Sequence, residues 1–173
     1  MDIVERLKER GESGATLTEE EMKAVEKILG FRLSTLLRRI YLEVNKRGEF
    51  GPEVGLFGFG RDNNPYLTMS GNIIEVYNFL RQKCELWPEK LLPVTELGCD
   101  VYLCVDCSTD EGAVVEFEPS LYPHFIPVAT STEQWLAAWL DNPGIGPLNE
   151  EHTPYNKEDS FVIRDGIEDD IPF

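Results

Sequence analysis

Residues 101–118 read VYLCVDCSTDEGAVVEFE, and this stretch decides the fold class. Residues 101–107 and 113–118 alternate with a period of two, which predicts two β-strands. Residues 108–112 between them are typical of a hairpin connection. The side chains that we expect to face inward are Val101, Leu103, Val105, Val115 and Phe117.

Helical patterns precede the hairpin. Thr18 and Glu21 form the ends of a capping box that opens a first helix, and Gly30 ends it. A second apolar stripe follows and stops near residues 45–48. The apolar positions expected are Met22, Val25, Ile28 and Leu29 in the first helix and Leu33, Leu36, Leu37, Ile40, Tyr41 and Val44 in the second.

Two further helices are expected, one on each side of the hairpin. Asn72 can cap a third helix, which ends at the Trp87-Pro88 pair. Residues 130–133, Thr-Ser-Thr-Glu, read as another capping box that opens a last helix before Asn142. The expected apolar positions are Ile73, Tyr77, Leu80 and Cys84 in the third helix and Trp135, Leu136, Trp139 and Leu140 in the last.

Helices, then strands, then a helix indicate an α+β fold. We expect N-terminal helices packed on a central, mostly antiparallel sheet, followed by a C-terminal helix and an acidic tail. The expected organisation is a helical lead-in at residues 1–17, one domain at 18–141, and a Pro- and Gly-containing acidic tail at 142–173. The glycine-punctuated segment 50–60 predicts a turn, a short strand and a second turn.

The formal net charge of the chain is −16, and it is unevenly distributed. Residues 1–47 carry 10 basic and 9 acidic side chains, residues 48–140 carry 4 and 14, and residues 141–173 carry 2 and 9. Such a field repels phosphate backbones and anionic lipid and speeds encounters with basic partners. The sequence therefore argues against direct nucleic-acid or membrane binding.

The N-terminal sequence MDIVERLKERG is charged from its second residue, unlike a signal peptide. We expect a cytoplasmic protein whose cysteines are reduced thiols. Cys104 and Cys107 form a CxxC motif, but Cys84 and Cys99 are 15 residues apart and do not complete a zinc-ribbon pattern. No metal or cofactor is expected, and packed thiols are the favoured interpretation.

The sequence contains weak candidates for catalysis. Glu116 and Glu118 project from one strand face at about 7 Å, the separation of carboxylates in inverting glycosidases. A hydrolase is therefore one hypothesis, although alternating Glu on a solvated sheet face is the usual meaning. His124 has no partner Ser or Cys in a nucleophile context. Gly55, Gly58 and Gly60 lack the Lys-Ser/Thr of a phosphate loop and are typical of tight turns.

The remaining candidate is an acidic surface. If the hairpin buries the side chains named above, its other face carries an acidic patch with one aromatic anchor, which suits a basic protein partner. The predicted protein-binding residues are Asp100, Tyr102, Asp106, Asp110, Glu111, Glu116 and Glu118. The alternatives are a solvated sheet face, a face covered by the tail, and a structural hydrogen bond at Asp106.

Several blocks in order resemble the SUKH superfamily, the Smi/Knr-type domain, over about residues 18–141. They include Gly48-Glu-Phe-Gly-Pro-Glu-Val-Gly-Leu-Phe-Gly58, Trp87-Pro-Glu-Lys-Leu-Leu-Pro93, Gly98-Cys-Asp-Val-Tyr-Leu-Cys-Val-Asp-Cys107, Val114-Val-Glu-Phe-Glu-Pro119 and Ser131-Thr-Glu-Gln-Trp-Leu136, besides the helices at 24–30 and 33–45. The sequence departs from the family pattern in three places: Ser34 stands in place of Pro, Lys46-Arg47 in place of the glycine of Asn-Gly-Gly, and Asp100 in place of Gly.

The resemblance implies an α+β fold without catalytic apparatus. For the bacterial branch it implies an immunity protein that neutralises a toxin, often a nuclease, by direct binding. Eukaryotic relatives imply an alternative role as an intracellular adaptor or regulator. The residues that contact a toxin do not carry over from the family.

Overall fold

A four-stranded antiparallel sheet lies at the centre of the fold, with strands in chain order. The computed structural model describes residues 2–48, 50–51, 55–59, 72–98, 100–119 and 125–143. The strands are β1 (Leu91–Gly98), β2 (Val101–Asp106), β3 (Val114–Phe117) and β4 (Phe125–Ala129). The helices are α1 (Ile3–Glu9), α2 (Glu19–Leu29), α3 (Thr35–Glu43), α4 (Ile73–Lys83) and α5 (Thr132–Asp141).

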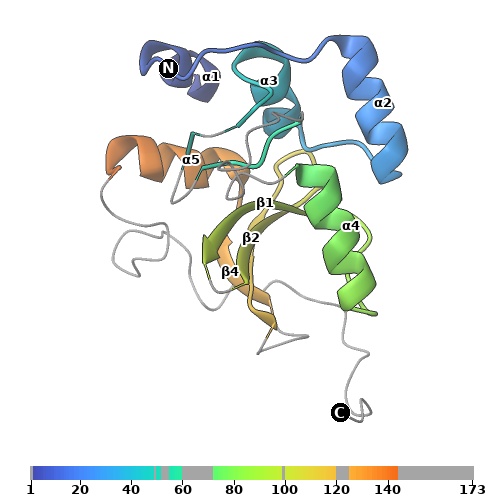
Figure 1. The fold of residues 1–173 in the computed structure, drawn as a ribbon. Helices are drawn as coiled ribbons and strands as arrows, with labels where there is room; N and C mark the ends of the chain where they lie inside the picture. The colour runs from blue at the N-terminus through green and yellow to red at the C-terminus, as the bar shows by residue number, and fades with distance from the viewer. Residues whose placement is uncertain are drawn as a thin grey trace.

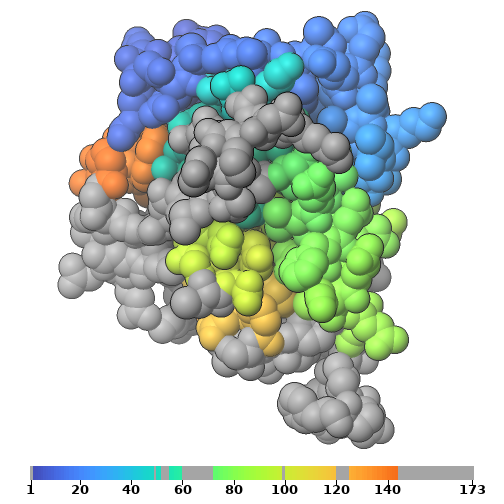
Figure 2. Space-filling model, in the orientation of Figure 1, coloured from blue at the N-terminus to red at the C-terminus, as the bar shows by residue number. Residues whose placement is uncertain are grey.

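The α+β prediction is confirmed. Figure 1 shows α1, α2 and α3 gathered at one end of the molecule, while α4 runs beside the sheet. The space-filling view shows the same division, with α1 and α2 (blue) lying across one end of the molecule and α4 and the strands below them (Figure 2). Apart from residues 142 and 143, the predicted acidic tail lies outside the described residues. No helix in the described part of the chain has the length and apolar composition needed to cross a membrane.

The capping box of α2 is confirmed. The Glu21 amide donates to Thr18 Oγ1 at 3.2 Å, the Thr18 amide donates to Glu21 Oε2 at 2.8 Å, and Gly30 ends the helix with φ 86°. The cap of α5 lies one residue later than predicted. Ser131 caps this helix by accepting from the Gln134 amide at 3.1 Å, and Gln134 Oε1 accepts from the Thr130 amide. The amide side chain of Gln134, rather than the Glu133 carboxylate, therefore completes this turn.

Most predicted core positions are buried, with a few corrections. Ile28 is 64% exposed, so it lies outside the apolar face of α2. Helix α4 ends at Lys83, before the Trp87-Pro88 pair, because the chain is already extended at Cys84. The short strand expected within residues 50–60 is not formed in the described part of that segment. Gly58 makes only an isolated parallel bridge to Asn72.

The predicted faces of the β2–β3 hairpin are wrong. Tyr102 pairs with Phe117, Leu103 with Glu116 and Cys104 with Val115. Directly paired residues share a face, so Leu103 shares its face with Glu116 and not with Phe117. A register shift of one residue moves every side chain of a strand to the other face. Because Leu103, Cys104 and Val115 are all buried, the apolar pattern could not select the register.

Tyr41 links α3 to residues 55–59. Its hydroxyl is fully buried and donates to the Phe57 carbonyl at 2.7 Å. The Phe57 amide in turn donates to the Val94 carbonyl of β1 at 2.7 Å. Burial raises the pKa of Tyr41 well above its usual value, so the phenol stays a donor at physiological pH. One side chain therefore ties a helix to the segment beside the sheet edge.

We expect Tyr41→Phe to lower the free energy of unfolding by about 1–2 kcal/mol, because the Phe57 carbonyl loses its buried donor. Tyr77→Phe is the matched control, since the hydrogen bond from Tyr77 to the Glu89 carbonyl is only partly buried. Urea denaturation of both variants measures the difference. Equal losses in the two variants would contradict the role assigned to Tyr41.

Asp100 occupies a backbone conformation that favours glycine. Its φ is 63°, and among the described residues it is the one non-glycine residue with a positive φ. It lies in the turn between β1 and β2. Non-glycine residues in this region carry backbone strain, although Asp tolerates it better than most.

Asp100→Gly should raise the free energy of unfolding by up to about 1 kcal/mol, since relief of strain outweighs the extra freedom of the unfolded chain. Ser108→Gly, at an exposed turn position without positive φ, should instead lower it slightly. Thermal denaturation of both variants at neutral pH distinguishes the two effects. A lower midpoint for Asp100→Gly would show that its carboxylate has a structural role.

Candidate protein-binding surface

The seven predicted binding residues fall at two opposite ends of the sheet. Asp106, Asp110 and Glu111 lie at the end where the β2–β3 turn closes. Asp100, Tyr102, Glu116 and Glu118 lie at the other end, with Tyr102 and Phe117 directly paired. The structure therefore does not bring all seven together. We call the first group the turn acids and the second end of the sheet the distal end.

The turn acids make contacts within the fold. Asp106 Oδ1 accepts from the Ser108 amide at 2.8 Å, which confirms the structural alternative for Asp106. Asp110 accepts from Thr35 twice, from its amide through the backbone carbonyl at 3.1 Å and from its hydroxyl through Oδ1 at 3.2 Å. The Glu111 carbonyl accepts from the Thr132 amide at 3.1 Å. That these three residues also contact a protein partner remains a prediction.

Tyr102 is not the exposed anchor that the alternating pattern predicts. Only 7% of its surface is exposed, and its ring lies 6.4 Å from that of Phe57. Burial, followed by the charges of Glu96 and Asp100, raises the pKa of its hydroxyl. The correction follows from the register, because Tyr102 shares its face with the buried Phe117. Glu96, directly opposite Tyr102, was missed by the sequence analysis because strand β1 was not delimited.

Glu116 sits among apolar neighbours on the opposite face. It pairs with Leu103 on one side and with Ile126 on the other. Partial burial, with a smaller contribution from the charge of Glu118, raises the pKa of its carboxyl. Ile126 is 41% exposed, so an apolar side chain accompanies the acids at this position. Sequence reasoning missed Ile126, because Pro127 hides the strand pattern of β4.

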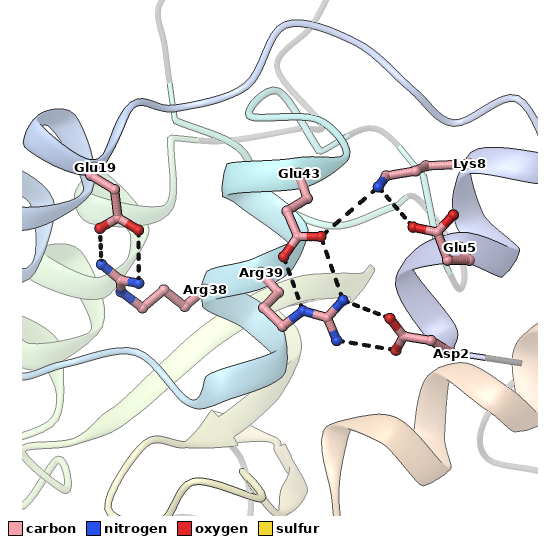
Figure 3. Close-up of polar contacts among 7 residues, drawn as sticks. All are labelled: Asp2, Glu5, Lys8, Glu19, Arg38, Arg39 and Glu43. Carbon is pink, nitrogen blue, oxygen red and sulfur yellow. Dashed lines mark hydrogen bonds and ion pairs between the residues drawn. The ribbon is translucent and has the colours of Figure 1, made fainter.

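Charge is segregated between the two halves of the molecule. From Leu91 to Pro143 the sequence holds nine acidic residues and neither Lys nor Arg. Five of the ten basic residues in residues 1–47, namely Arg6, Lys8, Arg10, Arg38 and Arg39, form ion pairs with acidic residues. Figure 3 shows this network, which joins Arg39 to Asp2 and Glu43, Lys8 to Glu5 and Glu43, and Arg38 to Glu19.

The acids of the sheet are not balanced in this way. Within the described part of the chain, no ion pair involves Glu96, Asp100 or Glu116, nor any of the turn acids. Unbalanced charge of one sign raises the encounter rate with a partner of the opposite sign. The distal end therefore presents negative potential that a basic protein surface can neutralise.

The thiols are packed, as the sequence analysis favoured. Cys104 and Cys107 are buried, and burial raises the pKa of the Cys107 thiol to about 12. A thiol that stays protonated is a poor nucleophile and a poor metal ligand. Across the described residues there is no group of three His, Cys, Asp or Glu side chains that could hold a metal. His124 and Cys99 lie outside the described residues.

Steric constraints explain why glycine occupies the positions that were considered for a phosphate loop. A Cβ on Gly58 would collide with the carbonyl of Arg47, and Gly55 has φ 89°. The turn interpretation is therefore confirmed at these two positions. Gly60 lies outside the described residues.

Glu116→Gln should stabilise the folded protein at neutral pH. A carboxyl whose pKa is raised by folding destabilises the fold when it is ionised. This cost begins to shrink as pH falls through the folded pKa, and it is gone once pH is below the unfolded pKa as well. The expected increase in the melting temperature is roughly 1–3 °C at pH 7, and it should shrink toward zero as pH is lowered through the Glu range. A decrease at pH 7 would show that the ionised carboxylate has a favourable partner.

Comparison with known proteins agrees with the resemblance seen in the sequence. Residues 16–138, which are 123 of the 173 residues, match the SMI1 / KNR4 family (SUKH-1). No curated protein matches the chain. The matched range contains α2, α3, α4, the whole sheet and most of α5, whereas α1 precedes it. The chain belongs to the SMI1 / KNR4 family (SUKH-1).

Proposed function

We propose that this chain is a non-catalytic immunity protein that neutralises a basic toxin domain by binding it in the cytoplasm. The observation that carries the proposal is the segregation of charge, with nine acidic residues and no Lys or Arg between Leu91 and Pro143. Nuclease toxins bind phosphate with basic surfaces, and an acidic inhibitor can occupy such a surface. Membership in the family supports a protein-binding role.

The distal end is the surface proposed for this contact. Asp100, Glu116 and Glu118 lie at this end, Glu96 lies there on the other face of the sheet from Glu116, and the four strands contain no Lys or Arg. The turn acids add to the same negative field from the far end of the sheet, although the carboxylates of Asp106 and Asp110 also accept hydrogen bonds within the fold. Long-range attraction depends on the whole acidic half, whereas close contact depends on the distal end.

Affinity capture tests the proposal. This protein serves as bait in nuclease-treated lysate of the source cell, and capture is carried out at low and at high salt. We expect one basic domain near one-to-one, weakened by salt, whose toxicity the bait suppresses on co-expression. The variant Glu116→Lys should reduce both capture and protection at least tenfold, because it reverses charge at the distal end. Glu20→Lys, on the exposed first turn of α2, is the matched control and should leave both unchanged.

An adaptor role on the same fold is the second candidate. One observation favours it: Phe79 of α4 and Leu86 beyond it are 49% and 40% exposed. A largely apolar contact through these side chains would be indifferent to salt. The adaptor role predicts that the captured partners have no particular charge and bind equally at low and high salt. Phe79→Ser should abolish their capture and Glu116→Lys should not. This result would contradict the immunity role.

A further inference from the structure

The exposed side of α2 carries cations and apolar side chains together. Residues four apart on a helix are neighbours on one face. Two such pairs lie side by side on the exposed side of α2, Lys23 with Lys27 and Ala24 with Ile28. Ile28 is 64% exposed, the largest fraction among the large apolar side chains of the described residues. Arg32, also exposed, follows just beyond the helix. We call these five residues the α2 surface.

The cations of the α2 surface are not neutralised within the fold. Among the described residues, none of its three cations forms an ion pair. The nearby Glu19 has a lowered pKa, mainly through its hydrogen bonds from Arg38, and the charges of Lys23 and Arg32 contribute less. Arg38 donates to both carboxylate oxygens of Glu19. Even with the exposed Glu20 counted, the α2 surface therefore keeps a net positive charge.

The chain itself contains a segment of complementary chemistry. Residues 158–171 read EDSFVIRDGIEDDI and hold six acids against one Arg, with large apolar residues between the acids. This segment lies outside the described residues. Its acids can neutralise the cations of the α2 surface while one of its apolar side chains covers Ile28. The sheet half offers such a segment no cations, because residues 91–143 contain neither Lys nor Arg.

The segment is tethered within reach of α2. From Pro143, the last described residue, to Glu158 the chain can extend over about 50 Å. A domain of this size is about 40 Å across. A short tether gives the segment an effective concentration on the order of a millimolar, so that even a weak contact forms within one molecule. A second copy of the chain would have to reach that concentration in solution to compete.

We propose that residues 158–171 dock on the α2 surface of the same molecule, with their acids on its cations and an apolar side chain on Ile28. The inference goes beyond the proposed function and does not depend on it, because α2 belongs to the helical end of the molecule and not to the sheet (Figure 1). A basic helix face that includes an apolar side chain is also the pattern that binds anionic membrane surfaces. Docking of the segment therefore shields the basic helix face from such surfaces.

Zero-length cross-linking of the full chain with a carbodiimide tests the docking, because this reagent joins a Lys amine to a carboxylate only where the two are in contact. An equal mixture of ¹⁴N and ¹⁵N chains is cross-linked, and digested protein is analysed by mass spectrometry. We expect acids of residues 158–170 to be joined to Lys23 and Lys27 within one copy. The exposed Lys83 and Lys90, outside α2, serve as reference amines and should give much lower yields. High salt should reduce the α2 cross-links.

Ile28→Ser should lower the yield of the α2 cross-links about threefold, because it removes the apolar contact and leaves every charge in place. Ile126→Ser is the matched control, since Ile126 is also an exposed isoleucine, at 41%, but lies in the acidic half. It should leave the yields unchanged. Equal yields at all four lysines, or yields that Ile28→Ser does not lower, would overturn the inference. Cross-links that join only a ¹⁴N copy to a ¹⁵N copy would also overturn it, because the segment would then dock on a second molecule.

Discussion

The fold depends on the turn between β2 and β3, which is clamped against the first turns of two helices. Its carbonyls accept from the Thr35 amide of α3 and the Thr132 amide of α5, both at 3.1 Å, and from the Thr132 hydroxyl at 2.8 Å. The first amides of a helix have no partner within the helix. One turn thus satisfies donors of both helices and holds the sheet against them.

Gly112 makes this clamp possible. Its φ is 62°, and a Cβ there would lie 2.7 Å from Ser34 Oγ and 2.8 Å from Thr132 Oγ1. The close approach of turn and helices leaves no room for a side chain. The carboxylate of Asp110 accepts from the Thr35 hydroxyl beside the positive end of the α3 dipole, where negative charge is favourable. The carboxylates of Asp106 and Asp110 therefore have a structural use, and the distal end of the sheet is the part that we propose for a partner.

Local chemistry made much of the fold predictable. The capping box at Thr18, the glycine stop at Gly30 and the period-two strands each depend on residues close in sequence. The register between β2 and β3 was not predictable, because both faces are buried and the outcome depends on how the turn packs against α3 and α5. The error at Tyr102 is a direct result of that register.

The candidate surface was predictable in charge but not in composition. Counting side chains located the acidity correctly in the middle of the chain, because charge needs no three-dimensional information. Division of the seven residues between two ends required the sheet topology. Ile126 escaped notice because Pro127 interrupts the pattern of β4, and its pairing with Glu116 is visible only across strands.

Amide hydrogen exchange at Thr35 and Thr132 measures the clamp most directly. Both amides are bonded to the hairpin turn, so we predict that they exchange only through global unfolding and that their protection equals that of the core strands. In Gly112→Ala both should lose protection together. Exchange of either amide at the rate of a solvated helix end in the wild-type protein would contradict the account, because the turn would then not hold the two helices.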